Sequence, residues 1–135
     1  MEIDPKYSIG IPEMDAQHAR WIALIEKFRA AGADGLQDQA GINAAAAALQ
    51  ELQGYTLTHF GSEERFLADR RYPDLEAHKR LHRDLEREVA RLLAEIQSPA
   101  KDRAPLKLNL FINVWLLDHI LKEDAKYARF VLQKS

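Results

Sequence analysis

The sequence predicts an all-α protein, an antiparallel up-down-up-down bundle of four helices with an N-terminal arm. Three observations support this prediction. Apolar residues recur at intervals of three and four, proline and glycine divide the chain into four long pieces, and no stretch alternates Val, Ile and Thr as a strand does. Amphipathic helices joined by short links pack as antiparallel neighbours around one core.

The first two helices are bounded by glycine and proline. The first follows Gly10-Ile11-Pro12 and is closed by Gly32, Asp34 and Gly35. Its core stripe consists of Met14, His18, Ile22, Ile25 and Phe28. The second extends from about Asp38 to Arg71 and ends at Tyr72-Pro73, because proline cannot continue a helix. Its stripe consists of Ala45, Leu49, Leu52, Thr56, His59, Glu63 and Phe66.

The third and fourth helices follow the same rule. The third fills residues 74–97 and is stopped by Ser98-Pro99. Its stripe is the clearest, and the residues between its members are mostly charged: Leu75, His78, His82, Leu85, Val89, Leu92 and Ile96. The fourth starts near Pro105, since proline is favoured in the first turn. Its stripe consists of Leu108, Ile112, Trp115 and His119.

Composition limits the classes to which the chain can belong. Its 135 residues suit a single domain over positions 1–135, and 47% hydrophobic with 30% charged residues is typical of a globular protein. The net charge of −2 gives no basis for binding nucleic acid or an anionic membrane. The absence of cysteine excludes disulfides, thiolate zinc sites, iron–sulfur clusters and a cysteine nucleophile.

The chain is expected to be cytoplasmic. Its start, Met1-Glu2-Ile3-Asp4-Pro5, carries acids where a signal peptide carries bases. No stretch approaches the roughly 20 apolar residues of a membrane span. A net charge near zero with many charged residues favours a monomer.

All five histidines fall on core stripes, and Glu63 lies one turn after His59. A lone histidine on an apolar face is usually a core residue hydrogen-bonded to a neighbour, and a His-x-x-x-His spacing alone is weak. The whole set is different, because burying so many polar groups without partners would cost several kcal/mol each. A metal ion removes that cost by accepting their lone pairs.

The spacing supports a shared metal site. His78 and His82, four residues apart on one helix face, can hold one ion, while His59 and Glu63 point into the same space. There are more ligands than a closed tetrahedral zinc site needs. Imidazoles with carboxylates and no sulfur favour iron, with manganese, zinc or cobalt as substitutes.

These residues belong to longer motifs that cover nearly the whole chain. The motifs are Gly10-Ile11-Pro12-Glu13-Met14-Asp15-Ala16-Gln17-His18, His59-Phe60-Gly61-Ser62-Glu63-Glu64, Tyr72-Pro73, His78-Lys79-Arg80-Leu81-His82, Trp115-Leu116-Leu117-Asp118-His119-Ile120 and Asp124-Ala125-Lys126-Tyr127. With one histidine, then His-x-x-x-Glu, His-x-x-x-His and His-x-x-x-x-Asp in that order, the chain resembles the hemerythrins, most closely the bacterial hemerythrin-like proteins.

The resemblance implies a non-haem di-iron centre that binds dioxygen reversibly. It assigns one iron to three histidines and the other iron to two, with bridges from two carboxylates and a solvent-derived oxo or hydroxo group. The ligands it implies are His78, His82 and His119 on one iron, His18 and His59 on the other, and Glu63 and Asp124 on both. On two six-coordinate irons, this set leaves one position open, on the iron bound by the two histidines.

One implied ligand disagrees with ideal helix geometry. Glu123, four residues after His119, is the better-aligned carboxylate, whereas Asp124 lies roughly 140° around the helix. The choice of Asp124 requires the last helix to bend or break just after His119. The acids Glu64, Asp118 and Glu123 are then expected to be ordinary exposed charges.

A dioxygen site needs a dry, apolar pocket. The apolar residues that flank or face the ligands, and are expected to line it, are Ile22, Phe60, Trp115, Leu116 and Ile120. Plain core packing is the alternative for each of them. For Tyr127, three residues after Asp124, a hydrogen bond to a ligand and a plain packing role are equally open.

Three classes of function fit this reading. The first is an oxygen carrier, store or supplier, which is not an enzyme and whose partner would be an oxygen-using enzyme or a signalling protein. The second is an oxygen or redox sensor. The third is a di-iron enzyme acting on peroxide or nitric oxide. No Ser-His-Asp set, phosphate loop or acid pair offers a rival active site.

Overall fold

The computed structural model describes residues 4–31, 38–97 and 117–133, and these ranges are almost entirely helical. The helices are α1 (Pro12–Ala31), α2 (Gln39–Asp69), α3 (Leu75–Gln97) and a last rod formed by α5 (Leu117–His119), η3 (Ile120–Asp124) and α6 (Ala125–Gln133). A short 3-10 helix, η1 (Pro5–Tyr7), precedes them. No strand occurs within the described ranges.

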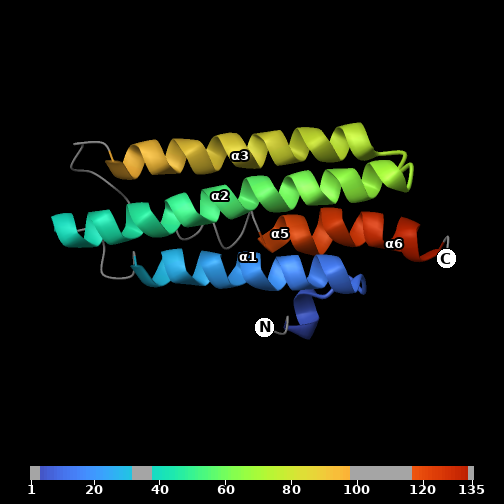
Figure 1. Cartoon of the computed structure of the whole chain (residues 1–135), viewed down its shortest axis with the longest axis horizontal. Coiled ribbons are helices and arrows are strands. Elements are labelled where there is room, and N and C mark those ends of the chain that lie inside the picture. Colours follow the sequence, from blue (N-terminus) through green and yellow to red (C-terminus); the bar gives the residue numbers. More distant parts are fainter. Residues whose placement is uncertain (1–3, 32–37, 98–116, 134–135) are drawn as a thin grey trace.

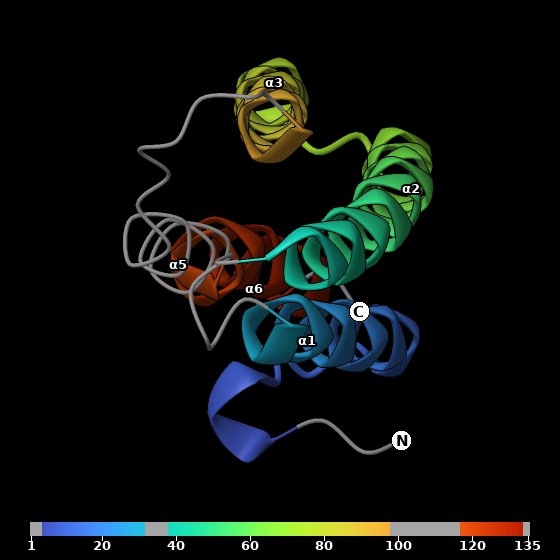
Figure 2. The ribbon, with the colours of Figure 1, turned by 90° about the vertical axis from the view of Figure 1, so that its left-hand side faces the viewer.

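The chain reverses direction from each rod to the next, so that α1, α2, α3 and the α5–α6 rod run antiparallel in chain order (Figure 1). Seen nearly end-on, the four rods surround a common interior (Figure 2). The predicted four-helix bundle is confirmed. The predicted start of the last helix near Pro105 lies outside the described residues.

The first three helices begin and end within a few residues of their predicted bounds. Asp38 caps α2, because its side chain accepts a hydrogen bond from the Gly41 amide at 2.7 Å. The predicted stripe of α2 is buried throughout. On α1 the prediction was partly wrong: Ile22 is only half-buried, whereas the indole of Trp21 is fully buried.

The end of α2 is fixed by a Schellman motif. The Tyr72 amide donates to the Leu67 carbonyl at 3.0 Å, and the Arg71 amide donates to the Ala68 carbonyl at 3.1 Å. Arg71 takes a left-handed conformation, with a φ of 55°. Tyr72 and Leu67 are buried in the same apolar cluster, an apolar contact that often accompanies this motif. The short link then leads directly into α3.

The core consists of two apolar clusters with a polar layer between them. The larger cluster includes Trp21, Phe60, Leu85 and Ile120. The smaller one consists of Ile11, Met14, Phe66, Leu67, Tyr72, Tyr127 and Ala128. On α1, His18 lies between Met14 of the smaller cluster and Trp21 of the larger one, and on α2 Glu63 lies between Phe60 of the larger cluster and Phe66 of the smaller one.

The N-terminal arm is attached at the end of the bundle nearer the smaller cluster. The Asp15 carboxylate accepts hydrogen bonds from the Ser8 hydroxyl at 2.6 Å and the Ile9 amide at 2.8 Å. Gly10 has a φ of 80°, and a Cβ there would approach the Leu132 side chain of α6 to 3.4 Å. The arm therefore packs beside both α1 and α6.

Among the described helices, none combines the length and the apolar character that a membrane crossing requires.

The left-handed conformation of Arg71 predicts a gain in stability from glycine at this position. A side chain costs about 1–2 kcal/mol in this conformation, and part of that gain is lost to the greater freedom of glycine when unfolded. We expect Arg71→Gly to raise the free energy of unfolding by about 0.5–1 kcal/mol, measured by urea denaturation. Arg71→Ala, which removes the same side chain but keeps Cβ, should bring no such gain. Equal stabilities for the two variants would refute this explanation.

Candidate metal centre

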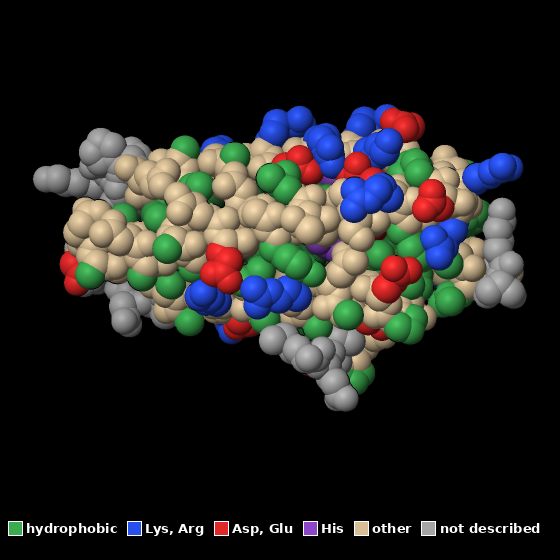
Figure 3. Space-filling view, in the orientation of Figure 1, with side chains coloured by type: hydrophobic (Ala, Val, Ile, Leu, Met, Phe, Trp, Pro, Cys, Tyr) green, Lys and Arg blue, Asp and Glu red, His purple; other side chains and the backbone are tan. Residues whose placement is uncertain are grey.

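Seven buried polar side chains from all four rods meet in the layer between the two apolar clusters. Their exposed fractions are between 0 and 6%, and they are His18, His59, Glu63, His78, His82, His119 and Asp124. The surface view shows only small parts of histidine side chains on one face (Figure 3). The structure thus brings together every residue that the sequence motifs singled out as a ligand.

The seven side chains form two overlapping groups. In each group, one nitrogen or oxygen atom from every member lies within 4.8 Å of the others. One group is Glu63, His78, His82, His119 and Asp124, and the other is His18, His59, Glu63 and Asp124. Both carboxylates therefore belong to both groups, and either group could hold a cation.

Glu63 turns one oxygen toward each group. Its Oε1 lies 2.9 Å from the Nε2 atoms of both His78 and His82. Its Oε2 lies 3.5 Å from Nε2 of His18 and 3.4 Å from Nε2 of His59. This is the arrangement expected of a carboxylate that bridges two cations.

Asp124 is arranged in the same way. Its Oδ1 lies 3.1 Å from the Nε2 atoms of both His78 and His119, and its Oδ2 lies 3.0 Å from Nε2 of His18. Both carboxylates thus lie between the three-histidine group and the two-histidine group.

The irregularity expected after His119 is a π-helix. In η3 the Ala125 amide donates to the Ile120 carbonyl five residues earlier, instead of four as in an α-helix. The wider turn brings Asp124, five residues after His119, onto the same face as that histidine. Glu123 is left half-exposed, and Asp118 pairs with Lys122 at 3.4 Å on the surface.

The chemistry of these donors fits a cation. His18 Nε2 and His119 Nε2 lie at hydrogen-bond distance from Asp124, yet neither they nor the Asp124 oxygens form a hydrogen bond. The Nε2 atoms of His59 and His82 are buried without a hydrogen-bond partner as well. Buried polar atoms are rarely left unsatisfied, and a cation would satisfy all of them together.

The electrostatics of these seven side chains show how strongly the cluster attracts positive charge. Burial disfavours the imidazolium form, but contacts with Asp124 and Glu63 outweigh it and raise the pKa of His18 to about 9 and that of His78 to about 10. Burial alone would raise the pKa of each carboxyl, but the surrounding imidazoles hold both pKa values well below their usual range. The two carboxylates therefore stay ionised and need a cationic partner.

Three further side chains hold members of the cluster from outside. Gln17 accepts a hydrogen bond from Nδ1 of His59 through its Oε1 at 2.7 Å. The Tyr127 hydroxyl donates to Oε2 of Glu63 at 2.9 Å, which settles the open question about Tyr127. Such outer contacts fix the orientation of ligating groups.

The third outer side chain, Glu64, corrects a prediction. Glu64 was expected to be an exposed charge, but its side chain is only 13% exposed because Oε2 accepts a hydrogen bond from Nδ1 of His82 at 2.8 Å. The same oxygen also pairs with Arg83. Spacing within α2 cannot reveal this contact, since His82 lies on α3.

An apolar wall borders the histidines. The Phe60 ring stacks on His82, with centroids 3.7 Å apart and planes within 3°, and Ile120 is fully buried in the same cluster. Ile22 is half-buried and packs against that cluster. The two other predicted pocket residues, Trp115 and Leu116, lie outside the described residues.

The prediction missed Trp21 as a residue of this wall. Its ring centroid lies 5.3 Å from that of His59 and 6.3 Å from that of His18. Its Nε1 donates to the Thr56 hydroxyl at 3.0 Å, and that hydroxyl donates to the Leu52 carbonyl at 2.7 Å. The position of Trp21, three residues after His18, was the signal that could have identified it.

Comparisons with known proteins agree with this geometry. The family model described as the hemerythrin HHE cation binding domain matches residues 9–131. A bacteriohemerythrin of Stenotrophomonas maltophilia (strain R551-3) is 31% identical over 121 residues, which cover 90% of this chain and 74% of that protein. A bacteriohemerythrin of Pseudomonas aeruginosa (strain LESB58) is 33% identical over 88% of this chain and 73% of its own length. A hemerythrin-like protein of Naegleria gruberi is 29% identical over 92% and 87%.

The buried bond between Trp21 and Thr56 predicts a specific loss of stability. Thr56→Val keeps the side-chain shape but leaves the indole N–H without an acceptor, which costs about 1–3 kcal/mol of unfolding free energy. Thr58 makes the same bond to a carbonyl four residues earlier but is exposed. Thr58→Val should therefore stay within about 0.5 kcal/mol of the parent chain in urea denaturation. Similar losses in both variants would contradict the proposed role of Thr56.

Proposed function

The chain belongs to the hemerythrin family, and from this premise we propose that it holds two iron ions and binds dioxygen reversibly, as a carrier, store or local supplier of oxygen. The observation that supports this most directly is the pair of ligand groups that share Glu63 and Asp124. Two overlapping groups suit two neighbouring cations better than one, because each carboxylate offers a separate oxygen to each group.

In this proposal the three-histidine group holds one iron and the two-histidine group holds the other. The residues that would hold them are His78, His82 and His119 for the first, His18 and His59 for the second, and Glu63 and Asp124 for both. Iron would supply the reversible electron exchange with dioxygen, which none of these side chains can perform. The protein holds the ligands in place and keeps the carboxylates ionised.

The inequality of the two groups supports binding of a small molecule at one position. The two-histidine group offers one side-chain ligand fewer than the other group. A small molecule would therefore enter beside His18 and His59, next to the buried ring of Trp21. Apolar walls exclude water from such a site and so protect bound dioxygen from protonation and loss.

The donor set also favours binding over oxidation. Within the described ranges, two carboxylates accompany the five histidines in the centre. Neutral imidazoles donate less negative charge than carboxylates and give less support to strongly oxidised iron. Carboxylate-rich di-iron proteins, built on Glu-x-x-His pairs, are the contrasting class.

The experiment that tests this function uses an anaerobic ferrous sample with a measured metal content. The sample is titrated with dioxygen while its visible spectrum is recorded, and dioxygen is then removed. We expect two irons per chain and an absorption band that appears with dioxygen and disappears on deoxygenation over repeated cycles. An immediate and permanent ferric spectrum would refute reversible binding and favour redox sensing or an enzyme acting on peroxide or nitric oxide.

The π-helix predicts that two adjacent carboxylates differ in their effect on iron binding. Asp124→Ala removes an acid that faces both groups, so ferrous affinity should fall by more than about tenfold. Glu123→Ala removes the same charge from the neighbouring position and should leave affinity unchanged. The ferrous affinities of both variants are measured by anaerobic competition with a chromophoric chelator. A loss in Glu123→Ala without one in Asp124→Ala would show that the wrong carboxylate has been assigned.

A further inference from the structure

The hydrogen bonds outside the centre are not the same for the two groups. His82, in the three-histidine group, donates its Nδ1 proton to Glu64, an anionic carboxylate, at 2.8 Å. His59, in the two-histidine group, donates its Nδ1 proton to Gln17, a neutral amide, at 2.7 Å. The two contacts have nearly the same length, so they differ mainly in the charge of the acceptor.

Two other features distinguish the two-histidine group. The Tyr127 hydroxyl donates to Oε2 of Glu63, which is the oxygen that faces His18 and His59. Nδ1 of His18 is buried and has no hydrogen-bond partner within the described part of the chain. Neither feature places negative charge beside this group, and the hydrogen bond from the phenol draws negative charge away from Oε2 of Glu63.

These differences act on a bound ion through its ligands. An anionic acceptor at Nδ1 makes an imidazole a stronger donor at Nε2, and this stabilises the more highly charged form of the ion that the imidazole holds. A hydrogen bond donated to a carboxylate oxygen has the opposite effect on the ion bound to that oxygen. Glu63 and Asp124 are themselves shared by both groups, so their charges largely cancel in the comparison.

We propose that Glu64, Gln17 and Tyr127 give the two iron positions different reduction potentials, so that the three-histidine position is oxidised first and the two-histidine position stays ferrous longer. This inference rests on the proposed pair of irons and adds the order in which they lose electrons. The position that stays ferrous is then the one with fewer side-chain ligands, where a small molecule would enter. All three residues are positioning residues, because each acts through a ligand.

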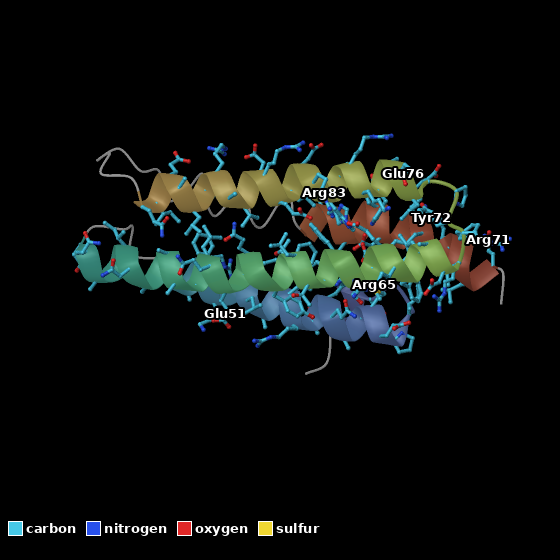
Figure 4. The ribbon with its side chains drawn as sticks, turned by 45° about the horizontal axis from the view of Figure 1, so that its top comes forward. Glu51, Arg65, Arg71, Tyr72, Glu76 and Arg83 are labelled. Atoms are coloured by element: carbon cyan, nitrogen blue, oxygen red, sulfur yellow. The ribbon has the colours of Figure 1, made fainter. Side chains whose placement is uncertain are left out.

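Arg83 moderates the effect of Glu64. Its guanidinium pairs with the Glu64 carboxylate, and its side chain is 47% exposed at the surface of α3 (Figure 4). Solvent screens this exposed cation more strongly than it screens the nearly buried carboxylate. Glu64 therefore retains a net negative effect on His82, and removal of Arg83 would increase it.

The test measures the two one-electron steps of the iron-loaded full chain by anaerobic spectroelectrochemistry. In each step one ferrous ion gives one electron to the electrode. Glu64→Gln keeps a hydrogen-bond acceptor but removes the negative charge. It should therefore raise the lower reduction potential, that of the three-histidine position, and narrow the difference between the two potentials. A tenfold loss of preference for the ferric form at that position corresponds to about 59 mV. The iron content should not change.

Variants beside the two-histidine group should change the potential of the second oxidation step. Gln17→Glu places an anion beside His59, and Tyr127→Phe removes the donor to Glu63; each should lower the higher potential and narrow the separation. Arg83→Gln should widen the difference between the two potentials, because it lowers the potential of the three-histidine position. If the buried charge of Gln17→Glu prevents folding, Glu64→Gln and Tyr127→Phe still decide the outcome.

Glu51→Gln is the matched control for charge. Glu51 is an exposed carboxylate on the outer side of α2, paired with Lys27 and about two turns before His59 (Figure 4). Its removal should leave both potentials unchanged. If Glu64→Gln shifted both reduction potentials equally, or shifted neither, the inference would be overturned.

The proposed function can fail while the inference about the two potentials holds. Two irons with unequal, variant-sensitive potentials but no reversible dioxygen band would support the inference and refute oxygen carriage. Fewer than two irons per chain would overturn both.

Discussion

Two carboxylates, Glu63 and Asp124, are completely buried in the middle of this bundle, and the rest of the structure depends on the positive charge that they require. An ionised carboxylate in a dry interior costs several kcal/mol unless a cation or strong hydrogen bonds compensate it. Five imidazoles from four rods surround the pair, and their own lone pairs also need a partner. A pair of bound cations, as proposed above, would satisfy both demands at once.

The fold meets this requirement by layering. Along α1 and α2 the polar residues lie between members of two apolar clusters, which border the centre on both sides. In η3 the last rod departs from regular α-helical geometry, and this departure brings Asp124 beside His119. Local π-helices of this kind are frequent at functional sites, where the altered direction of one side chain outweighs the weaker backbone geometry. The outer contacts of Gln17, Glu64 and Tyr127 then hold His59, His82 and Glu63 in position.

Periodicity within one helix was sufficient to predict α1, α2 and α3 and the burial of all five histidines, because the core-facing stripe repeats every three or four residues. Regular α-helical spacing favoured Glu123 as the carboxylate beside His119, and only the family resemblance pointed to Asp124. The reason is that the spacing of residues in the sequence does not reveal a π-helix. Contacts across helices were missed for a related reason. The partners of Trp21 and Glu64 depend on how α1, α2 and α3 are rotated against each other, which the spacing along a single helix does not define.

The proposed function depends on a pair of cations in the interior between Glu63 and Asp124. Anomalous X-ray diffraction at the iron absorption edge, from crystals of the iron-loaded chain, tests it most directly. We expect two anomalous peaks in the buried layer, one beside His78, His82 and His119 and the other beside His18 and His59. A single peak in that layer, or peaks only at surface carboxylates, would contradict it.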